Sequence, residues 1–427
     1  MKTLATSARY DPNPLRSLHL AWLAAAVFVV SAGYGALMPV LPGWLSSLMP
    51  SASASEVARH VGFFSGVYAA GVLVGAPLWG AISDRVGRTR TLFVGLIGYV
   101  ASQMLFLMPS LENLVALYTL RAATGFFVAA VVPVVSALVA EHTPEKKRSR
   151  RFAWLSAVSL LGFLFGPGLS EIADGARSFT GAGAGASTAA ASARFVILLS
   201  ALFGAAVMLG LARTLPSLSA GDGAAHEDLT ASSANRTTAL YWLSALVTMV
   251  LAGFELGIVL QAQQHSAMSS REVAVMFAEC SLVMLIVNGL LFLTGLLDKI
   301  SSRILIAVGL LLATSGLAVM AWHSIEAWLY LGIGLTSAGI GLVLPVIAYL
   351  AAGATRQKLG ATMGALAAAG SLGQTLGSSL GGWLFGLPAQ GSFGVLMIPL
   401  MGMLVLLLAR PELLPTKKGQ ENISDKQ

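Results

Sequence analysis

Twelve long apolar segments run through this chain, and the stretches between them hold most of its charged residues. Crossing the hydrocarbon core of a bilayer takes about 20 predominantly apolar residues in a helix. Because the bilayer offers the backbone no hydrogen-bond partners, each segment must satisfy its own backbone groups as a helix. Only 11% of the residues are charged and 56% are hydrophobic, which excludes an ordinary soluble domain. We therefore predict an all-α membrane protein with twelve transmembrane helices. The predicted spans are 18–48, 57–82, 90–109, 112–140, 151–172, 194–213, 238–264, 272–296, 303–322, 326–352, 360–385 and 393–410.

Basic residues are distributed unevenly between the two sets of loops. Clusters at 85–90 and 146–151 fall on the side of both predicted termini, whereas the opposite side carries only Arg59, Arg177, Arg194 and Arg271. Because basic loops stay in the cytoplasm, we predict that both termini are cytoplasmic. The net charge of +7 then reflects membrane topology, and no nucleic-acid partner is expected. The first apolar segment is too long for a cleavable signal, and the expected location is a bacterial inner membrane.

A polar hinge that occurs twice indicates two related halves. The stretch GAISDRVGRTR begins at Gly80 and GLLDKISSR begins at Gly295, each with an aspartate and cations after a glycine. Within the spans, AGYG at 32–35 is echoed by AGFE at 252–255. Duplicated helical bundles with a site at the repeat interface are a transporter architecture.

This repetition predicts two pseudo-symmetric six-helix bundles, at 1–213 and 238–410. The polar stretch 214–237 is expected to be a flexible cytoplasmic linker, and 411–427 a cytoplasmic tail. The Gly-, Ala- and Ser-rich run 174–193 is expected to be a mobile outer loop.

Four ordered motifs run through the amino-terminal half. The loop after span two has Gly80, Asp84, Arg85, Gly87 and Arg88; span four has Arg121, Gly125 and Pro133; span five has Gly162, Gly166, Pro167 and Gly168; and span one has GYGALMPVLPG at 33–43. In these motifs the chain resembles the major facilitator superfamily, and within it the twelve-span drug/proton antiporters, with span one similar to that of tetracycline exporters. The resemblance implies a transporter, and the fifth-span motif implies export rather than import.

The resemblance to tetracycline-type exporters breaks down at two places. Val30 stands where those proteins carry an acidic residue, and the fifth-span motif continues with Leu169 and Ser170 instead of two glycines. A proton carrier is therefore expected elsewhere, and Glu255 in span seven is the best candidate. Counting from Ala239 places Glu255 close to the bilayer centre, where an ionised carboxylate is costly. Its gain and loss of a proton would then respond to access and to bound ligand. The alternatives are a polar partner across the bundle, or a polar cavity in which Glu255 does not titrate.

Arg121 is the one basic residue predicted deep in a span. Its guanidinium hardly deprotonates, so it needs carbonyl groups, water or a carboxylate around it. The family resemblance implies a part for Arg121 in proton coupling, and the structural alternative is that it pins spans one and four together.

Two further groups of residues complete the predicted site. Asp84 and Asp298 lie at the cytoplasmic membrane edge, where a charge pair can hold one conformation and release in another, although a static topological role is the alternative. The predicted gating residues are Gly80, Asp84, Arg85, Gly87, Arg88, Asp298 and Lys299. Candidate substrate contacts are polar or aromatic residues within the spans, each equally open to a packing role: Tyr34, Phe165, Gln261, Gln264, Asn288, Tyr349 and Gln374.

No enzyme, metal site or cofactor is predicted. The sequence has no Walker loop, no Gly-x-Ser-x-Gly elbow and no metal-ligand spacing of His and Asp, and Cys280 is its only cysteine. The expected function is export of amphipathic small organic molecules by proton antiport with alternating access, carried out by a monomer. The alternatives are a dedicated exporter of an endogenous metabolite such as a siderophore, a proton-coupled importer, and a membrane scaffold or sensor.

Overall fold

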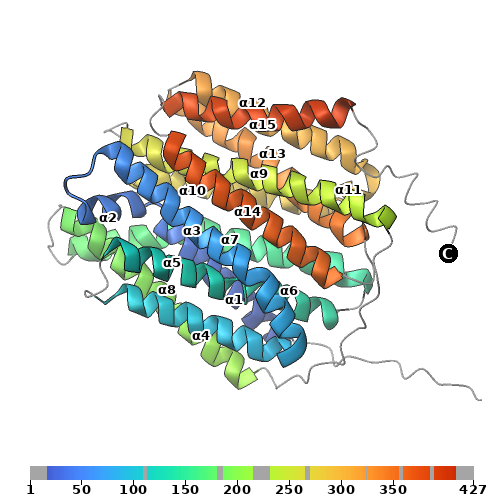
Figure 1. Ribbon diagram of the computed structural model, residues 1–427, viewed down its shortest axis with the longest axis horizontal. Helices are drawn as coiled ribbons and strands as arrows, with labels where there is room; N and C mark the ends of the chain where they lie inside the picture. The colour runs from blue at the N-terminus through green and yellow to red at the C-terminus, as the bar shows by residue number, and fades with distance from the viewer. Residues whose placement is uncertain are drawn as a thin grey trace, which may run out of the picture.

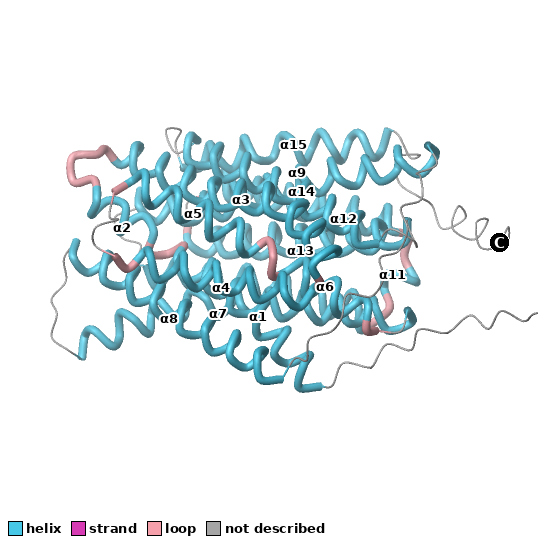
Figure 2. The backbone as a smooth tube through the Cα atoms, turned by 60° about the horizontal axis from the view of Figure 1, so that its bottom comes forward, coloured by secondary structure: helices cyan, strands magenta, loops and turns pink. Residues whose placement is uncertain are grey.

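A computed structural model describes residues 17–108, 113–143, 145–179, 186–214, 231–264, 270–323, 325–354, 359–384 and 389–409. All regular structure in these residues is α-helical, and the loops that join the helices are short (Figure 2). The helices are α1 (Ser17–Leu37), α2 (Leu41–Leu48), α3 (Ala54–Val86), α4 (Arg88–Phe106), α5 (Leu114–Val128), α6 (Val132–Glu141), α7 (Glu145–Phe179), α8 (Ala186–Thr214), α9 (Ala231–Gln264), α10 (Ser270–Leu293), α11 (Leu296–Lys299), α12 (Ser302–Trp322), α13 (Glu326–Ala354), α14 (Leu359–Leu384) and α15 (Ala389–Ala409).

Nine stretches of the described chain are long and apolar enough to cross a membrane. Helices α4 and α14 and a shorter apolar stretch at 154–169 in α7 occupy three of the other predicted spans. The all-α membrane class is therefore confirmed. The predicted linker 214–237 lies partly outside the described residues, and α9 already begins at Ala231.

Two predicted spans are broken in the structure. The span predicted at 18–48 ends as α1 at Leu37, and the separate helix α2 begins at Leu41, because Pro39 and Pro42 interrupt the backbone hydrogen bonding. The span predicted at 112–140 is divided into α5 and α6 by a tight turn at 129–131. Pro133 cannot donate a hydrogen bond to the carbonyl group one turn earlier, so the helix breaks there.

The prediction of a loop at 174–193 is wrong for most of that stretch. Helix α7 continues to Phe179 and α8 begins at Ala186. Alanine is the best helix former, so a run rich in alanine extends the flanking helices.

The helices form two layers, which correspond to the two halves of the sequence. In Figure 1 the blue and green helices of the amino-terminal half lie below the yellow to red helices of the carboxyl-terminal half. The halves meet chiefly where α3 packs along α14 and where α7 packs along α10. A site between the halves is therefore bounded by these four helices.

The contact between α3 and α14 is closest near the Ser53 end of α3. A Cβ atom added at Gly62 would lie 2.7 Å from the Ser378 carbonyl oxygen and 2.8 Å from the Gly382 Cα atom. At the same end, the Arg59 guanidinium lies 5.5 Å from the centre of the Trp383 ring. The two halves are thus in backbone contact at this end of the bundle.

Candidate functional site

A cavity of about 230 Å³ lies between the two halves. Its described lining residues are mostly apolar, include no charged group, and come from α1, α3, α7, α14 and the α5–α6 region: Val30, Ser31, Tyr34, Tyr68, Val72, Ala76, Val128, Ala129, Val132, Pro133, Phe163, Ala367 and Gln374. Val72 and Ala76 place the cavity further along α3 than the close contact at Gly62, toward the Gly87 end. The cavity is therefore shut off at the Ser53 end by the packing of α3 on α14.

The polar side of the cavity joins the two halves directly. The Gln374 amide of α14 donates a hydrogen bond to the Tyr34 hydroxyl of α1 over 3.2 Å. Ser31, one turn before Tyr34, shares a 2.8 Å hydrogen bond with Ser159 of α7. Tyr34 and Gln374, two of the predicted substrate contacts, are thus brought together in the cavity wall.

We expect Tyr34→Phe to weaken the state in which the halves are in contact at the Ser53 end. Removing the hydroxyl leaves the Gln374 amide without its acceptor, at a cost of about 0.5–1.5 kcal/mol for an ordinary hydrogen bond. Transport should be slowed about two- to tenfold, as measured by initial rates in membrane vesicles. Tyr68→Phe is the matched control, since no hydrogen bond of the Tyr68 hydroxyl is seen within the described residues. A Tyr34→Phe rate equal to the wild-type rate would show that this bond contributes nothing to the cycle.

Arg121 is buried behind the aromatic wall of this cavity. Only 2% of its surface is exposed, and its guanidinium carbon lies 4.5 Å from the centre of the Tyr68 ring, 5.2 Å from that of Phe64 and 5.4 Å from that of Tyr34. Such cation–π contacts are worth about 2 kcal/mol each when desolvated. Its Nε and one Nη atom have no hydrogen-bond partner among the described residues.

The surroundings of Arg121 bear on both predicted roles. Its ring contacts join α5 to α1 and α3, so they favour the pinning role, with α3 as an additional helix, but that role stays a prediction. The guanidinium group carries a buried positive charge, and no carboxylate among the described residues is paired with it. Burying an unpaired charge costs free energy. A role in coupling stays a prediction.

Glu255 lies across the interface from Tyr34. Its half-buried side chain is within electrostatic range of the Tyr34 hydroxyl, and it forms no ion pair with any described residue. The apolar part of α9 is Thr238–Leu260, so Glu255 lies about 9 Å beyond the middle of the span and not at its centre. Tyr34 likewise lies near the Leu37 end of α1. Glu255 itself is not among the described residues that line the cavity.

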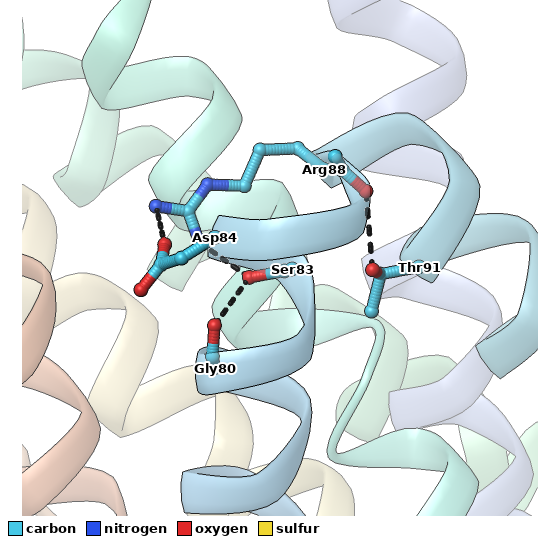
Figure 3. Close-up of polar contacts among 6 residues, drawn as sticks. Gly80, Ser83, Asp84, Arg88 and Thr91 are labelled. Atoms are coloured by element: carbon cyan, nitrogen blue, oxygen red, sulfur yellow. Dashed lines mark hydrogen bonds and ion pairs between the residues drawn. The ribbon is translucent and has the colours of Figure 1, made fainter. Parts of the chain in front are cut away.

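The polar residues of the first hinge interact with one another. An oxygen of Asp84 lies 2.6 Å from one terminal nitrogen of Arg88, and the other terminal nitrogen of Arg88 donates to the Ser83 hydroxyl (Figure 3). Gly87 has a φ of 104°, a backbone conformation that favours glycine, and it separates α3 from α4. The Asp84 carboxylate, near the end of α3, therefore pairs across the turn with Arg88, the first residue of α4, and the Arg85 side chain is exposed. A Cβ atom added at Gly80 would meet nothing within 4 Å, so close helix packing does not explain this glycine.

We expect Asp84→Asn to slow transport with little effect on stability. The Asp84 side chain is 62% exposed, and an exposed pair of this spacing is worth only about 0.3–0.5 kcal/mol. A thermal denaturation midpoint close to that of wild type, together with a reduced transport rate, would support the gating role. A wild-type rate would favour the purely topological role.

The second hinge also contains a glycine with positive φ, but its conformation and its place in the motif differ: Gly87 follows Asp84, whereas Gly295 precedes Asp298. Gly87 and Gly295 are the two glycines with positive φ among the described residues, and Gly295 has a φ of 65°. Each lies at a helix end in the corresponding loop of its half. Lys299 is exposed at the end of α11, whereas the Asp298 side chain lies outside what the structure describes.

The fifth-span motif packs α7 against α1. Added Cβ atoms would lie 2.6 Å from the Phe28 carbonyl oxygen at Gly162 and 2.7 Å from the Ala36 nitrogen at Gly166. Pro167 lies within α7, and a Cβ atom at Gly168 would meet nothing within 4 Å. Two of the four motif residues thus permit a close helix contact.

The remaining predicted substrate contacts do not join the cavity. Phe165 is 58% exposed on the outer surface, because it lies about 200° around α7 from Phe163, whose ring faces Tyr34. Asn288 is buried and donates to the Met284 carbonyl of its own helix, and the half-buried Tyr349 is not in the cavity lining. The side chains of Gln261 and Gln264 lie outside the described part of the chain.

Sequence reasoning missed Ser31, Tyr68 and Phe163 in the cavity wall, and the acid Glu279 in α10. Ser31 could have been found from its position one turn before Tyr34. Glu279 could have been found as a carboxylate in the first half of an apolar segment.

Two helical bundles with a cavity between them define the chain as a multi-pass secondary transporter. The sequence matches the Major Facilitator Superfamily over residues 23–295 and 256–426, so the chain belongs to that family, whose members are transporters and not enzymes.

Two curated proteins are similar to part of the chain. Quinolone resistance protein NorA of Staphylococcus aureus (strain N315) is 27% identical over 143 residues, which are 34% of this chain and 35% of that protein. Multidrug resistance protein 2 of Bacillus subtilis (strain 168) is 30% identical over 146 residues, or 34% of each chain. The matched stretch thus spans about a third of these relatives' length.

Solved structures share the fold over nearly the whole chain. The human organic anion transporter MFSD10 (TETRAN) superposes with a TM-score of 0.70 at 19% identity, covering 92% of this chain and all of that one. The xylose transporter XylE from E. coli, in a partially occluded inward open conformation, also gives 0.70, at 14% identity, covering 94% of this chain and 99% of that one.

Proposed function

We propose that this transporter exports amphipathic small organic molecules by proton antiport, alternating a central site between the two faces of a bacterial inner membrane. The observation that carries the proposal is the cavity between the halves. It is apolar along most of its wall and has a hydrogen-bonding end at Tyr34 and Gln374. A site of this kind suits molecules with an aromatic or aliphatic body and few polar groups.

Glu255, an acid within the apolar part of α9, supports proton coupling. Glu255 lacks an ion-pair partner among the described residues and lies within range of Tyr34, which lines the site. A carboxyl group in this position can exchange a proton with whichever side the cavity faces, and its charge affects what binds there.

The basic residues indicate which side of the membrane the cavity is nearer to. The hinge at the Gly87 end of α3 carries Arg85, Arg88 and Arg90, so this end is proposed to be cytoplasmic. The cavity lies on that side of the contact at Gly62, and this conformation would accept substrate from the cytoplasm. Both termini would then be cytoplasmic, with the halves joined by a linker on the same side.

The named relatives guide the choice of test compounds. NorA is named for quinolone resistance and the Bacillus subtilis protein for multidrug resistance. The test is accumulation of a fluorescent quinolone and of ethidium in an efflux-deficient bacterial host that expresses the chain. We expect accumulation to fall below that of a host with empty vector, and a protonophore to restore it.

Export of either compound alone, with accumulation restored by the protonophore, would support the proposal. Export that survives the protonophore would contradict proton antiport, and higher accumulation than in the empty-vector host would indicate import. If neither compound is expelled, the amphipathic-drug substrate class is wrong and a dedicated endogenous product becomes the substrate to seek.

A further inference from the structure

A second carboxylate lies inside the membrane part of the carboxyl-terminal half. Glu279 is in the first half of α10, where the exposed residues Val275, Leu282 and Ile286 form a stripe on one face of the helix. By helical spacing Glu279 belongs to this stripe, three or four residues from its neighbours. Its side chain is nevertheless half-buried, so it is folded back from that face.

The neighbouring helix α13 receives the Glu279 side chain at a glycine. A Cβ atom added at Gly334 would lie 3.3 Å from Oε1 of Glu279, so the carboxyl group lies directly against the α13 backbone. Its other oxygen, Oε2, is buried and has no hydrogen-bond partner among the described residues. A buried carboxylate oxygen without a hydrogen-bond donor or a cation beside it is costly, and the uptake of a proton removes the charge.

The charged and titratable groups near Glu279 are few. On α10 itself, Cys280 follows directly, and Arg271 and Glu272 lie more than a helical turn away. The helices that pack against α10 contribute one or two such residues each: Glu255 on α9, Lys299 on α11, Arg151 at the far end of the described part of α7, and Tyr330 and Tyr349 on α13. No described cation is paired with Glu279. Its charge is therefore not neutralised by a described neighbour.

The two intramembrane acids of this half lie on helices that pack together. Glu255 is in α9 and Glu279 is in α10, and helices α9, α10 and α13 all contact one another.

We propose that Glu279 is a second proton-binding group of this transporter, with Gly334 giving it room against α13. The proposal rests on proton antiport as the function. Each carboxylate takes up one proton and releases it when its surroundings change, so the carboxyl-terminal half would carry two protons in its fully protonated state.

The test reads protonation directly and does not depend on transport. Purified full-length protein in lipid nanodiscs is titrated across a pH series by infrared difference spectroscopy, in which a protonated carboxyl group has its own band that shifts in D₂O. The variants are Glu255→Gln, Glu279→Gln and the double variant, with Glu272→Gln on the same helix as the matched control.

We expect Glu279→Gln to remove one titrating carboxyl component and to leave the component that belongs to Glu255 in place. Glu255→Gln should leave the Glu279 component in place, the double variant should lose both, and the control should keep both. A Glu279→Gln titration identical to that of wild type overturns the proposal.

Gly334→Ala tests the same group without removing it. The added methyl group meets the carboxyl oxygen at 3.3 Å, so that oxygen must move by a few tenths of an ångström. The Glu279 component should shift while that of Glu255 keeps its amplitude. An unshifted Glu279 component would contradict the role given to Gly334, and this variant answers the question even if Glu279→Gln folds poorly.

A transport measurement separates this proposal from the proposed function. In proteoliposomes, an imposed pH gradient is used to drive the accumulation of ethidium. The ethidium concentration ratio should rise less steeply with the size of the pH gradient in Glu279→Gln than in wild type. If wild type moves no ethidium, the proposed substrate fails, whereas the infrared titration still decides whether Glu279 binds a proton. If the steepness is unchanged in an active Glu279→Gln variant, the second proton has no part in transport and that part of the proposal is wrong.

Discussion

Replacing Glu255 by glutamine is expected to abolish export that is driven by the proton gradient. The amide has nearly the same shape as the acid but cannot release a proton, so the site keeps its contacts and loses its coupling. Accumulation of a fluorescent quinolone in an efflux-deficient host should rise to the level of the empty-vector host. Binding of the compound to purified protein should persist, and its pH dependence should weaken.

The control for Glu255→Gln is Glu272→Gln, which removes a carboxylate from the first turn of α10. That variant should export normally. If Glu255→Gln exports as well as wild type, coupling lies elsewhere, and Arg121, Glu279 and the hinge acids become the candidates. If Glu255→Gln still moves substrate down a gradient in vesicles but not against one, the result supports a coupling role over a purely structural one.

Burial within the span would not by itself make Glu255 a proton-coupling residue. An acid at the lipid face of a span would be paired, or would reach toward the headgroups. Glu255 instead lies within electrostatic range of Tyr34, whose ring also covers Arg121 and whose hydroxyl accepts the hydrogen bond from Gln374. A change of charge at Glu255 therefore acts on a residue that belongs both to the cavity wall and to the contact between the halves.

The sequence predicts most of the helices, because a long apolar segment has few ways to satisfy its backbone in a bilayer. It does not predict where a span breaks. Pro39 and Pro133 produce turns within predicted spans, whereas Pro167, Pro345 and Pro399 lie inside continuous helices. Whether a proline ends a helix depends on what the packing around it supplies to the freed carbonyl group.

The site was less predictable than the fold, because the predicted residues were chosen without knowing which face of each helix points inward. Tyr34 and Gln374 were predicted and lie in the cavity wall, but Phe165 was chosen where Phe163 faces the site. The aromatic surroundings of Arg121 come from α1 and α3, far from it in sequence. A single sequence offers no sign of such contacts, whereas the glycine-rich hinge at Gly87 depends on local backbone geometry and was found directly.

The close contact between the halves leads to the second large effect, which we expect from Gly62→Leu. The new side chain would begin within 2.7 Å of the Ser378 carbonyl oxygen and 2.8 Å of the Gly382 Cα atom, and a backbone cannot move aside as a side chain can. Overpacking of this kind costs about 1–3 kcal/mol, which shifts a two-state equilibrium about 5- to 150-fold. The conformation closed at the Ser53 end of α3 should therefore be depopulated, and export should be largely lost.

Spin labels measure this shift without a substrate. With Cys280 replaced by alanine, cysteines at positions 59 and 383 would carry labels on the two sides of the contact, where Arg59 now lies over Trp383. The distance between the labels should lengthen in Gly62→Leu. Gly402→Leu is the matched control, because a Cβ atom at that glycine of α15 would meet nothing within 4 Å.

The two measurements together distinguish a gate from a mere packing defect. A gate predicts a longer label distance in a protein that remains folded and monodisperse, with binding of the fluorescent quinolone shifted and not destroyed. A general defect predicts loss of folded protein with no defined second distance. If Gly62→Leu exports normally with an unchanged label distance, α3 and α14 do not separate at this contact during transport, and the halves must open around a different point.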